Sequence, residues 1–113
     1  MIKVGREELK AKWKFLIEFI QKNHVMEPNI ERELFHNPKF KPQKGLCHTR
    51  GYFIIFNDYF VQYEMDHIIV DPNLSLIGRS LREVIFYDTF QDYEAARVKA
   101  MSASKDQTGI NFN

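Results

Sequence analysis

One segment constrains the fold more than any other: residues 52–65 read as two strands joined by a tight turn. The run at 52–56 is aromatic and β-branched, which is typical of a strand. Asn57 and Asp58 follow, and both residue types tolerate the positive φ angles of a two-residue turn. Polar and apolar residues then alternate over 59–65. We therefore predict an antiparallel β-hairpin, whose apolar faces need other elements to cover them.

Three further segments have helical patterns. Residues 5–23 carry apolar side chains at steps of three and four, the spacing of one helix face. Residues 28–36 predict a short helix that starts at a proline, since a proline in the first turn loses no hydrogen bond. Residues 80–101 predict a second long helix, because Ser80 and Glu83 match a capping box. The stripe of the first helix consists of Leu9, Trp13, Leu16 and Ile20.

These elements predict an α+β fold. A small antiparallel sheet, the hairpin plus a possible third strand, packs against two long helices and one short helix. Residues 67–70 either extend the hairpin through a bulge or form that third strand, and Pro- and Gly-containing residues 37–51 form a loop. We expect one globular domain at 1–101 and a flexible polar tail at 102–113.

Composition predicts the cellular compartment and the source of the chain. The only cysteine, Cys47, cannot form an internal disulfide, which favours a reducing cytoplasm. No apolar run approaches the length of a membrane span, so we expect no membrane association, and no motif predicts a cofactor or a metal site. Amino acids with AT-rich codons number 47 and those with GC-rich codons 20, which favours an AT-rich source such as a phage or mobile element.

The net charge of +1 conceals an uneven distribution. Residues 1–50 carry eight Lys and three Arg against six Glu, for +5, and residues 51–113 sum to −4. No acidic residue occurs between 34 and 57. This basic stretch predicts a binding loop for an acidic protein or for the phosphates of a nucleic acid, unless it pairs with the chain's own acidic half. The candidate binding residues are Lys39, Phe40, Lys41, Lys44, His48 and Arg50.

Aromatic and acidic residues predict a protein interface. Residues 52–56 are apolar at both parities, so both faces of the hairpin need cover. Asp88 and Asp92 are four residues apart and would share a face of the predicted second long helix. We take Tyr59 and Tyr63 of the hairpin together with these two acids as candidate interface residues, in a contact with a partner protein or in a homodimer.

A different function follows from Asp66, His67 and Asp71. The string Asp-His-Ile-Ile after a hairpin resembles the start of the metal-binding motif of HNH nucleases, in which a histidine is the general base and a cation holds the leaving oxygen. The chain departs from that motif, because residues 79–91 supply neither the Asn nor the second His. Under this alternative, the three residues would be catalytic and the basic loop would bind nucleic acid.

The sequence therefore favours binding over catalysis. We expect a small non-catalytic interaction protein, such as an inhibitor, an immunity protein or an accessory factor. It would act by binding a protein partner or by self-association. The alternative is a protein that binds or cleaves nucleic acid.

Overall fold

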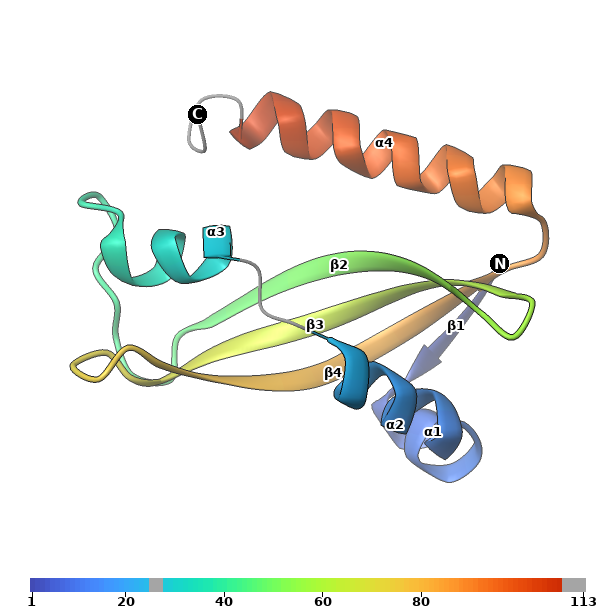
Figure 1. Ribbon diagram of the computed structural model, residues 1–113, viewed down its shortest axis with the longest axis horizontal. Helices are drawn as coiled ribbons and strands as arrows, with labels where there is room; N and C mark the ends of the chain where they lie inside the picture. The colour runs from blue at the N-terminus through green and yellow to red at the C-terminus, as the bar shows by residue number, and fades with distance from the viewer. Residues whose placement is uncertain (25–27, 109–113) are drawn as a thin grey trace.

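A computed structural model describes residues 1–24 and 28–108 of the chain, and it has the α+β class that the sequence predicts. The strands form one sheet, and helices lie on both sides of it (Figure 1). In chain order they are β1 (Ile2–Gly5), α1 (Arg6–Lys12), α2 (Lys14–Asn23), α3 (Pro28–Glu31), the π-helix η1 (Arg32–His36), β2 (Cys47–Phe56), β3 (Tyr59–Asp71), β4 (Leu76–Tyr87) and α4 (Phe90–Thr108).

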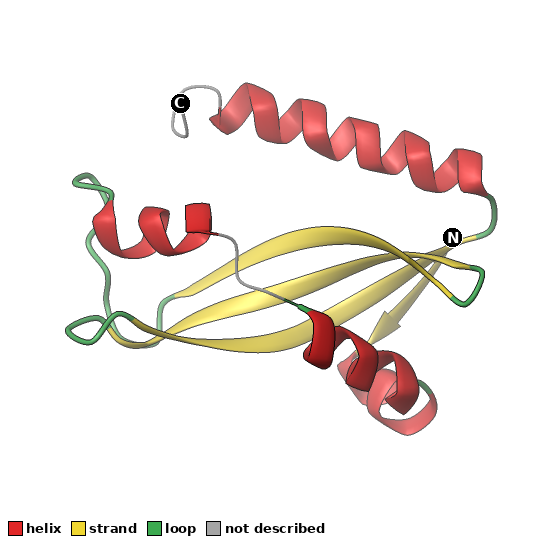
Figure 2. Cartoon of the chain, in the orientation of Figure 1, coloured by secondary structure: helices red, strands yellow, loops and turns green. Residues whose placement is uncertain are grey.

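The sheet has four antiparallel strands in the order β1-β4-β3-β2 (Figure 2). The predicted hairpin is confirmed: β2 and β3 pair from Phe56–Tyr59 outwards, and Asn57 and Asp58 have positive φ angles of 46° and 66°. Residues 67–70 extend β3 and do not form a separate strand. The third predicted strand is instead β4, and β1 adds a fourth strand that the sequence did not indicate.

The prediction of a helix from residue 80 is wrong, because residues 76–87 form β4 and α4 begins only at Phe90. A bulge explains the error. Glu64 pairs with Glu83 and Met65 with Leu81, so the residue between them on β4, Arg82, has no partner on β3. This extra residue breaks the two-residue period of the strand. The apolar side chains on either side of it then recur at helical spacing.

The first predicted helix is confirmed with a break at Trp13, where α1 ends and α2 begins. Leu9, Leu16 and Ile20 of its stripe are buried, and Trp13 packs against them. They lie on the sheet face formed by alternate residues of β3. We call this the α2 face, and its buried β3 residues are Val61, Tyr63, Met65, His67 and Ile69.

The opposite sheet face, the α4 face, receives the last helix. Tyr93 of α4 is buried there, with its ring 5.8 Å from the ring of Phe53 and 6.0 Å from that of Phe60. The sheet therefore separates α1 and α2 from α4 (Figure 1). Apolar residues of both parities in the hairpin account for the second covered face.

Two element boundaries in the structure also differ from the predicted ones. β2 begins at Cys47, so His48 and Arg50 are strand residues and the loop covers only 37–46. α4 continues to Thr108, inside the predicted tail, and residues 109–113 lie outside the described part of the chain. Within the described residues, no helix has the length and hydropathy to cross a membrane.

Candidate functional site

A row of three basic residues crosses the α2 face of the sheet. His48 on β2 lies opposite His67 on β3, and His67 lies opposite Arg79 on β4. The ring centres of the two histidines are 6.4 Å apart. His67 is fully buried, whereas Arg79 is exposed. The middle of the row is therefore closed to solvent.

His24, which ends α2, contacts this row with both its ring and its backbone. Its ring centre lies 6.2 Å from that of His67, and its Nδ1 atom lies 2.8 Å from the hydroxyl oxygen of Tyr63. Nη1 of Arg79 donates a hydrogen bond of 3.3 Å to the carbonyl oxygen of His24. The C-terminal end of α2 is thus held on β3 and β4 by polar contacts.

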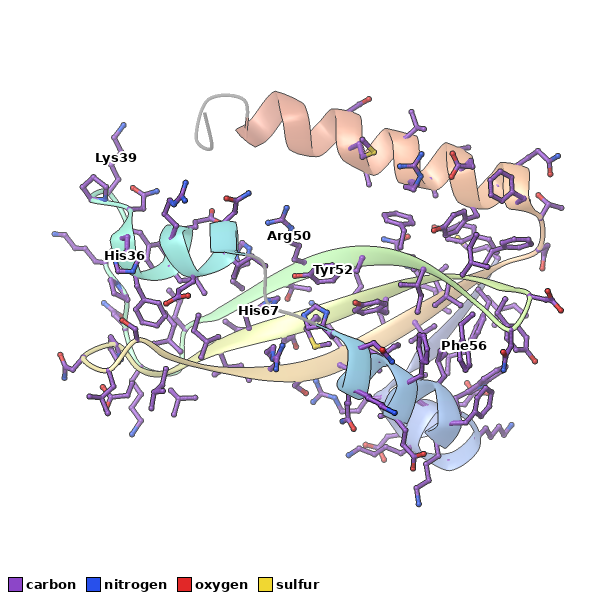
Figure 3. The ribbon with its side chains drawn as sticks, viewed as in Figure 1. His36, Lys39, Arg50, Tyr52, Phe56 and His67 are labelled. Carbon is purple, nitrogen blue, oxygen red and sulfur yellow. The ribbon has the colours of Figure 1, made fainter. Side chains whose placement is uncertain are left out.

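Aromatic rings and one carboxylate complete the surroundings of these histidines. Tyr52 stacks on Tyr63, with ring centres 5.2 Å apart, and its ring centre is 6.4 Å from that of His67 (Figure 3). On the other side, Oε2 of Glu33 in η1 lies 3.9 Å from Nε2 of His48. We call His24, His48 and His67 the histidine cluster; it joins α2, β2 and β3.

Burial determines the charge of His67. Neither of its ring nitrogens has a hydrogen-bond partner among residues 1–24 and 28–108. The pKa of His67 falls to about 4, mainly because burial removes the ring from water. The His48 backbone raises this pKa, and the side chains of His48, His24 and Arg79 each lower it by a smaller amount. The imidazole is therefore neutral at pH 7.

The arrangement of the cluster limits its chemistry. No group of three or more His, Cys, Asp or Glu side chains is placed to hold a metal ion in the part of the chain that the structure describes. His67 exposes none of its surface, so no substrate reaches it in this conformation. The cluster lies between the C-terminal end of α2 and the sheet.

The three residues of the nuclease alternative are not brought together. Asp66 neighbours His67 in β3 and so points to the opposite face of the sheet, where the Thr49 hydroxyl donates a hydrogen bond to it. Arg6 also forms an ion pair with Asp66 at 3.6 Å. Asp71 lies at the end of β3 and accepts a hydrogen bond from the backbone N–H of Asn73.

The basic loop is exposed at one end of the sheet. Lys39, Lys41 and Lys44 are exposed and Phe40 is half-buried. None of the three lysines forms an ion pair with a carboxylate of the described residues. The positive charge of the loop is therefore not neutralised there by the acidic half of the chain. Arg50 lies farther along β2, opposite Met65.

Exposed aliphatic side chains lie at the same end. The loop is attached to β3 by two hydrogen bonds, from Gly45 N–H to the Ile69 carbonyl oxygen and from Ile69 N–H to the Leu46 carbonyl oxygen. The turn from β3 to β4 is beside it (Figure 1). Five aliphatic side chains here are between 36% and 66% exposed. With the three lysines they form what we call the loop-end surface: Lys39, Lys41, Lys44, Leu46, Ile68, Val70, Leu74 and Leu76.

A glycine of β4, Gly78, lies within this surface. Ile68 lies opposite Gly78, and a Cβ atom placed on Gly78 would be 3.2 Å from Cγ2 of Val70. Gly78 therefore leaves room for Val70 to lie across β4. Exposed Cys47 is opposite Ile68 on the other side, which continues the surface onto β2.

The predicted interface residues are dispersed. Tyr63 is 5% exposed and belongs to the core, whereas Tyr59 is 40% exposed and meets Trp13 edge-on. Asp88 precedes α4 and pairs with the N-terminal amino group at 3.1 Å. Asp92 lies in the first turn of α4. The expectation that these two acids share a helix face is wrong, since α4 starts after Asp88.

The sequence did not indicate several residues of the histidine cluster and of the loop-end surface. His24 and Glu33 reach His48 and His67 only through the tertiary fold, and no local pattern indicates this. Val70 and Leu76 could have been found from the alternation of their strands, but residue 76 lay outside every predicted strand. The missing signal was the extent of β3 and β4.

Comparisons with known proteins assign no family to the chain. No protein-family model matches it, and neither the curated proteins nor the solved structures give a significant match. The function therefore has to be argued from the geometry.

Proposed function

We propose that the protein acts by binding a protein partner through the loop-end surface, without chemistry of its own. The observation that carries the proposal is the combination, at one end of the sheet, of five exposed aliphatic side chains with three lysines that have no carboxylate partner among the described residues. Interfaces typically have an apolar centre and a charged rim.

The apolar part supplies the binding energy. Contiguous exposed apolar surface on a soluble chain often marks an interaction site. Ile68, Val70 and Leu76 extend from paired strands, so their backbone is already ordered before a partner binds. A preordered surface loses little conformational entropy on association, which favours affinity.

The charged part indicates the chemistry of the partner. Lys39, Lys41 and Lys44 leave an uncompensated positive charge beside the apolar side chains. An acidic partner surface would be attracted to it, and the attraction would raise the association rate. We therefore propose a partner with an apolar patch bordered by Asp and Glu side chains. A second copy of the chain, through its acidic half, is one such partner.

The test compares variants of the loop end with a matched control. The immobilised chain is used to capture proteins from its source cells, in wild-type form and as Val70→Glu/Leu76→Glu. The control is Val98→Glu/Met101→Glu, which places the same two charges on exposed apolar positions of α4. We expect a defined partner whose recovery falls at least about tenfold with the loop-end variant, because a buried unpaired charge is costly, and is unchanged with the control. Equal recovery with both variants would reject the proposal.

Light scattering separates self-association from binding to another protein. If the partner is a second copy, the purified wild-type chain is a dimer and the loop-end variant a monomer. A nucleic-acid partner is the competing function, carried by the same three lysines. It predicts binding to a DNA or RNA 20-mer that weakens steeply with salt and is lost in Lys41→Glu but kept in the uncharged variant Val70→Ser/Leu76→Ser.

A further inference from the structure

The histidine cluster connects three segments that are distant in sequence. His24 ends α2, His48 lies on β2 and His67 on β3. The ring of His67 is 6.2 Å from that of His24 and 6.4 Å from that of His48, measured between centres. His67 is fully buried and its two ring nitrogens lack partners among the described residues. Such a residue is tolerated only while it is neutral.

We propose that the histidine cluster is an acid-sensitive lock, which holds the C-terminal end of α2 on the sheet near neutral pH and releases it when His67 is protonated. Release lets the His67 ring reach water, which solvates its charge. His24 is the part that moves, because it ends α2 and its ring lies beside that of His67. The lock is independent of the loop-end proposal.

The basic side chains that face His67 all lower its pKa. From β2 it faces His48, from β4 Arg79, and from α2 His24.

One carboxylate lies close to the cluster. Glu33 of η1 is 3.9 Å from Nε2 of His48. Glu33 is not among the groups that shift the pKa of His67.

The size of the effect follows from proton linkage. With a pKa of about 4 in the closed state and 6.5 in the open state, acidification from pH 7.5 to pH 5 multiplies the opening equilibrium constant by about 30. This factor applies to His67 alone. The pH dependence that comes from other titrating groups is the same in the wild-type chain and in a variant that lacks only His67.

Hydrogen exchange of the whole chain tests the lock. We expect the amides in the last turn of α2 to exchange about 30-fold faster at pH 5 than at pH 7.5, after correction for the intrinsic rate. Amides of β3 at 61–63, which open only when the whole fold unfolds, should stay better protected than the last turn of α2 at both pH values. The His67→Phe variant should lose the acceleration in α2, and His36→Gln, at an exposed histidine, should keep it. Equal acceleration in wild type and His67→Phe, or equal protection of β3 and the last turn of α2 at pH 5, would overturn the proposal.

A second measurement covers the case in which His67→Phe does not fold. Titration of the histidine ring signals by NMR follows His67 directly in the wild-type chain, and His67→Asn assigns its signal. We expect the ring to gain its proton together with the faster exchange at the end of α2. Protonation near pH 6.5 without faster exchange would overturn the lock.

Discussion

The Nδ1 atom of His24 lies 2.8 Å from the hydroxyl oxygen of Tyr63, so the residue that ends α2 is hydrogen-bonded to the middle of the central strand. Tyr63 is buried and stacks on Tyr52, which fixes the position of its hydroxyl group. This hydrogen bond connects the packing of α1 and α2 on the sheet to the histidine cluster. The predictions that follow test this packing and the charges around it.

Removing the Tyr63 hydroxyl should destabilise the protein. Tyr63→Phe keeps the ring stacking but takes away the hydrogen bond to His24, and we expect a loss of about 1–2 kcal/mol in the free energy of unfolding. Urea denaturation measures it. Tyr59→Phe is the control, because Tyr59 is 40% exposed, and it should change the stability by less than about 0.5 kcal/mol. Equal effects of the two substitutions would contradict the role of the bond.

Stability should fall as the solution becomes acidic. Burial lowers the pKa of His67 from 6.5 to about 4, so the unfolded chain binds this proton more tightly than the folded chain. The stability associated with neutral His67 is fully present above about pH 7.5 and is lost as the pH falls from 6.5 to 4. The loss approaches about 3 kcal/mol. Urea denaturation at several pH values should show a flatter dependence in His67→Phe; parallel curves would refute this origin.

The opposite sign is expected at Glu64, on the α4 face. Burial raises the pKa of Glu64, a hydrogen bond from Gln62 lowers it, and Glu83 directly opposite on β4 raises it. Glu64→Gln should therefore stabilise the protein at pH 7 by about 0.5 kcal/mol, because it removes one of two facing like charges. The gain should shrink as the pH falls and Glu64 becomes protonated. A gain that persists at pH 3 would point to a cause other than charge.

The contact between α2 and the sheet should dominate the stability of the core. Leu16 is fully buried in it, and Leu16→Ala should cost about 2–5 kcal/mol. The same truncation at Leu74, which is 66% exposed in the turn after β3, should cost less than about 0.5 kcal/mol. Thermal unfolding distinguishes them. Similar shifts in Tm would mean that α2 is not part of the cooperative core.

The local patterns predicted the elements that follow a regular period. The stripe at Leu9 and Leu16 predicted the first helix, and the alternation around Asn57 and Asp58 predicted the hairpin. The bulge at Arg82 hid β4, because it gives a strand the apolar spacing of a helix. Strand β1, with four residues, is too short for a pattern and exists because β4 offers it an edge.

The candidate sites were less predictable than the fold. The sequence singled out His48, His67 and the loop lysines, but it placed His48 in a loop that binds an acidic protein or phosphates. It gave His67 a catalytic role only under the nuclease alternative. The structure places the two histidines opposite each other in a closed row. Such a pairing depends on the register of β2 and β3, which no single segment encodes.

The central claim is that the loop-end surface contacts a protein partner. Hydrogen-exchange footprinting of the chain, alone and in complex with the captured partner, tests it most directly. The account predicts protection in residues 37–46 and 68–76 and none in α4 at 94–101. Protection that falls on α4, or that leaves both loop-end segments unchanged, would contradict it.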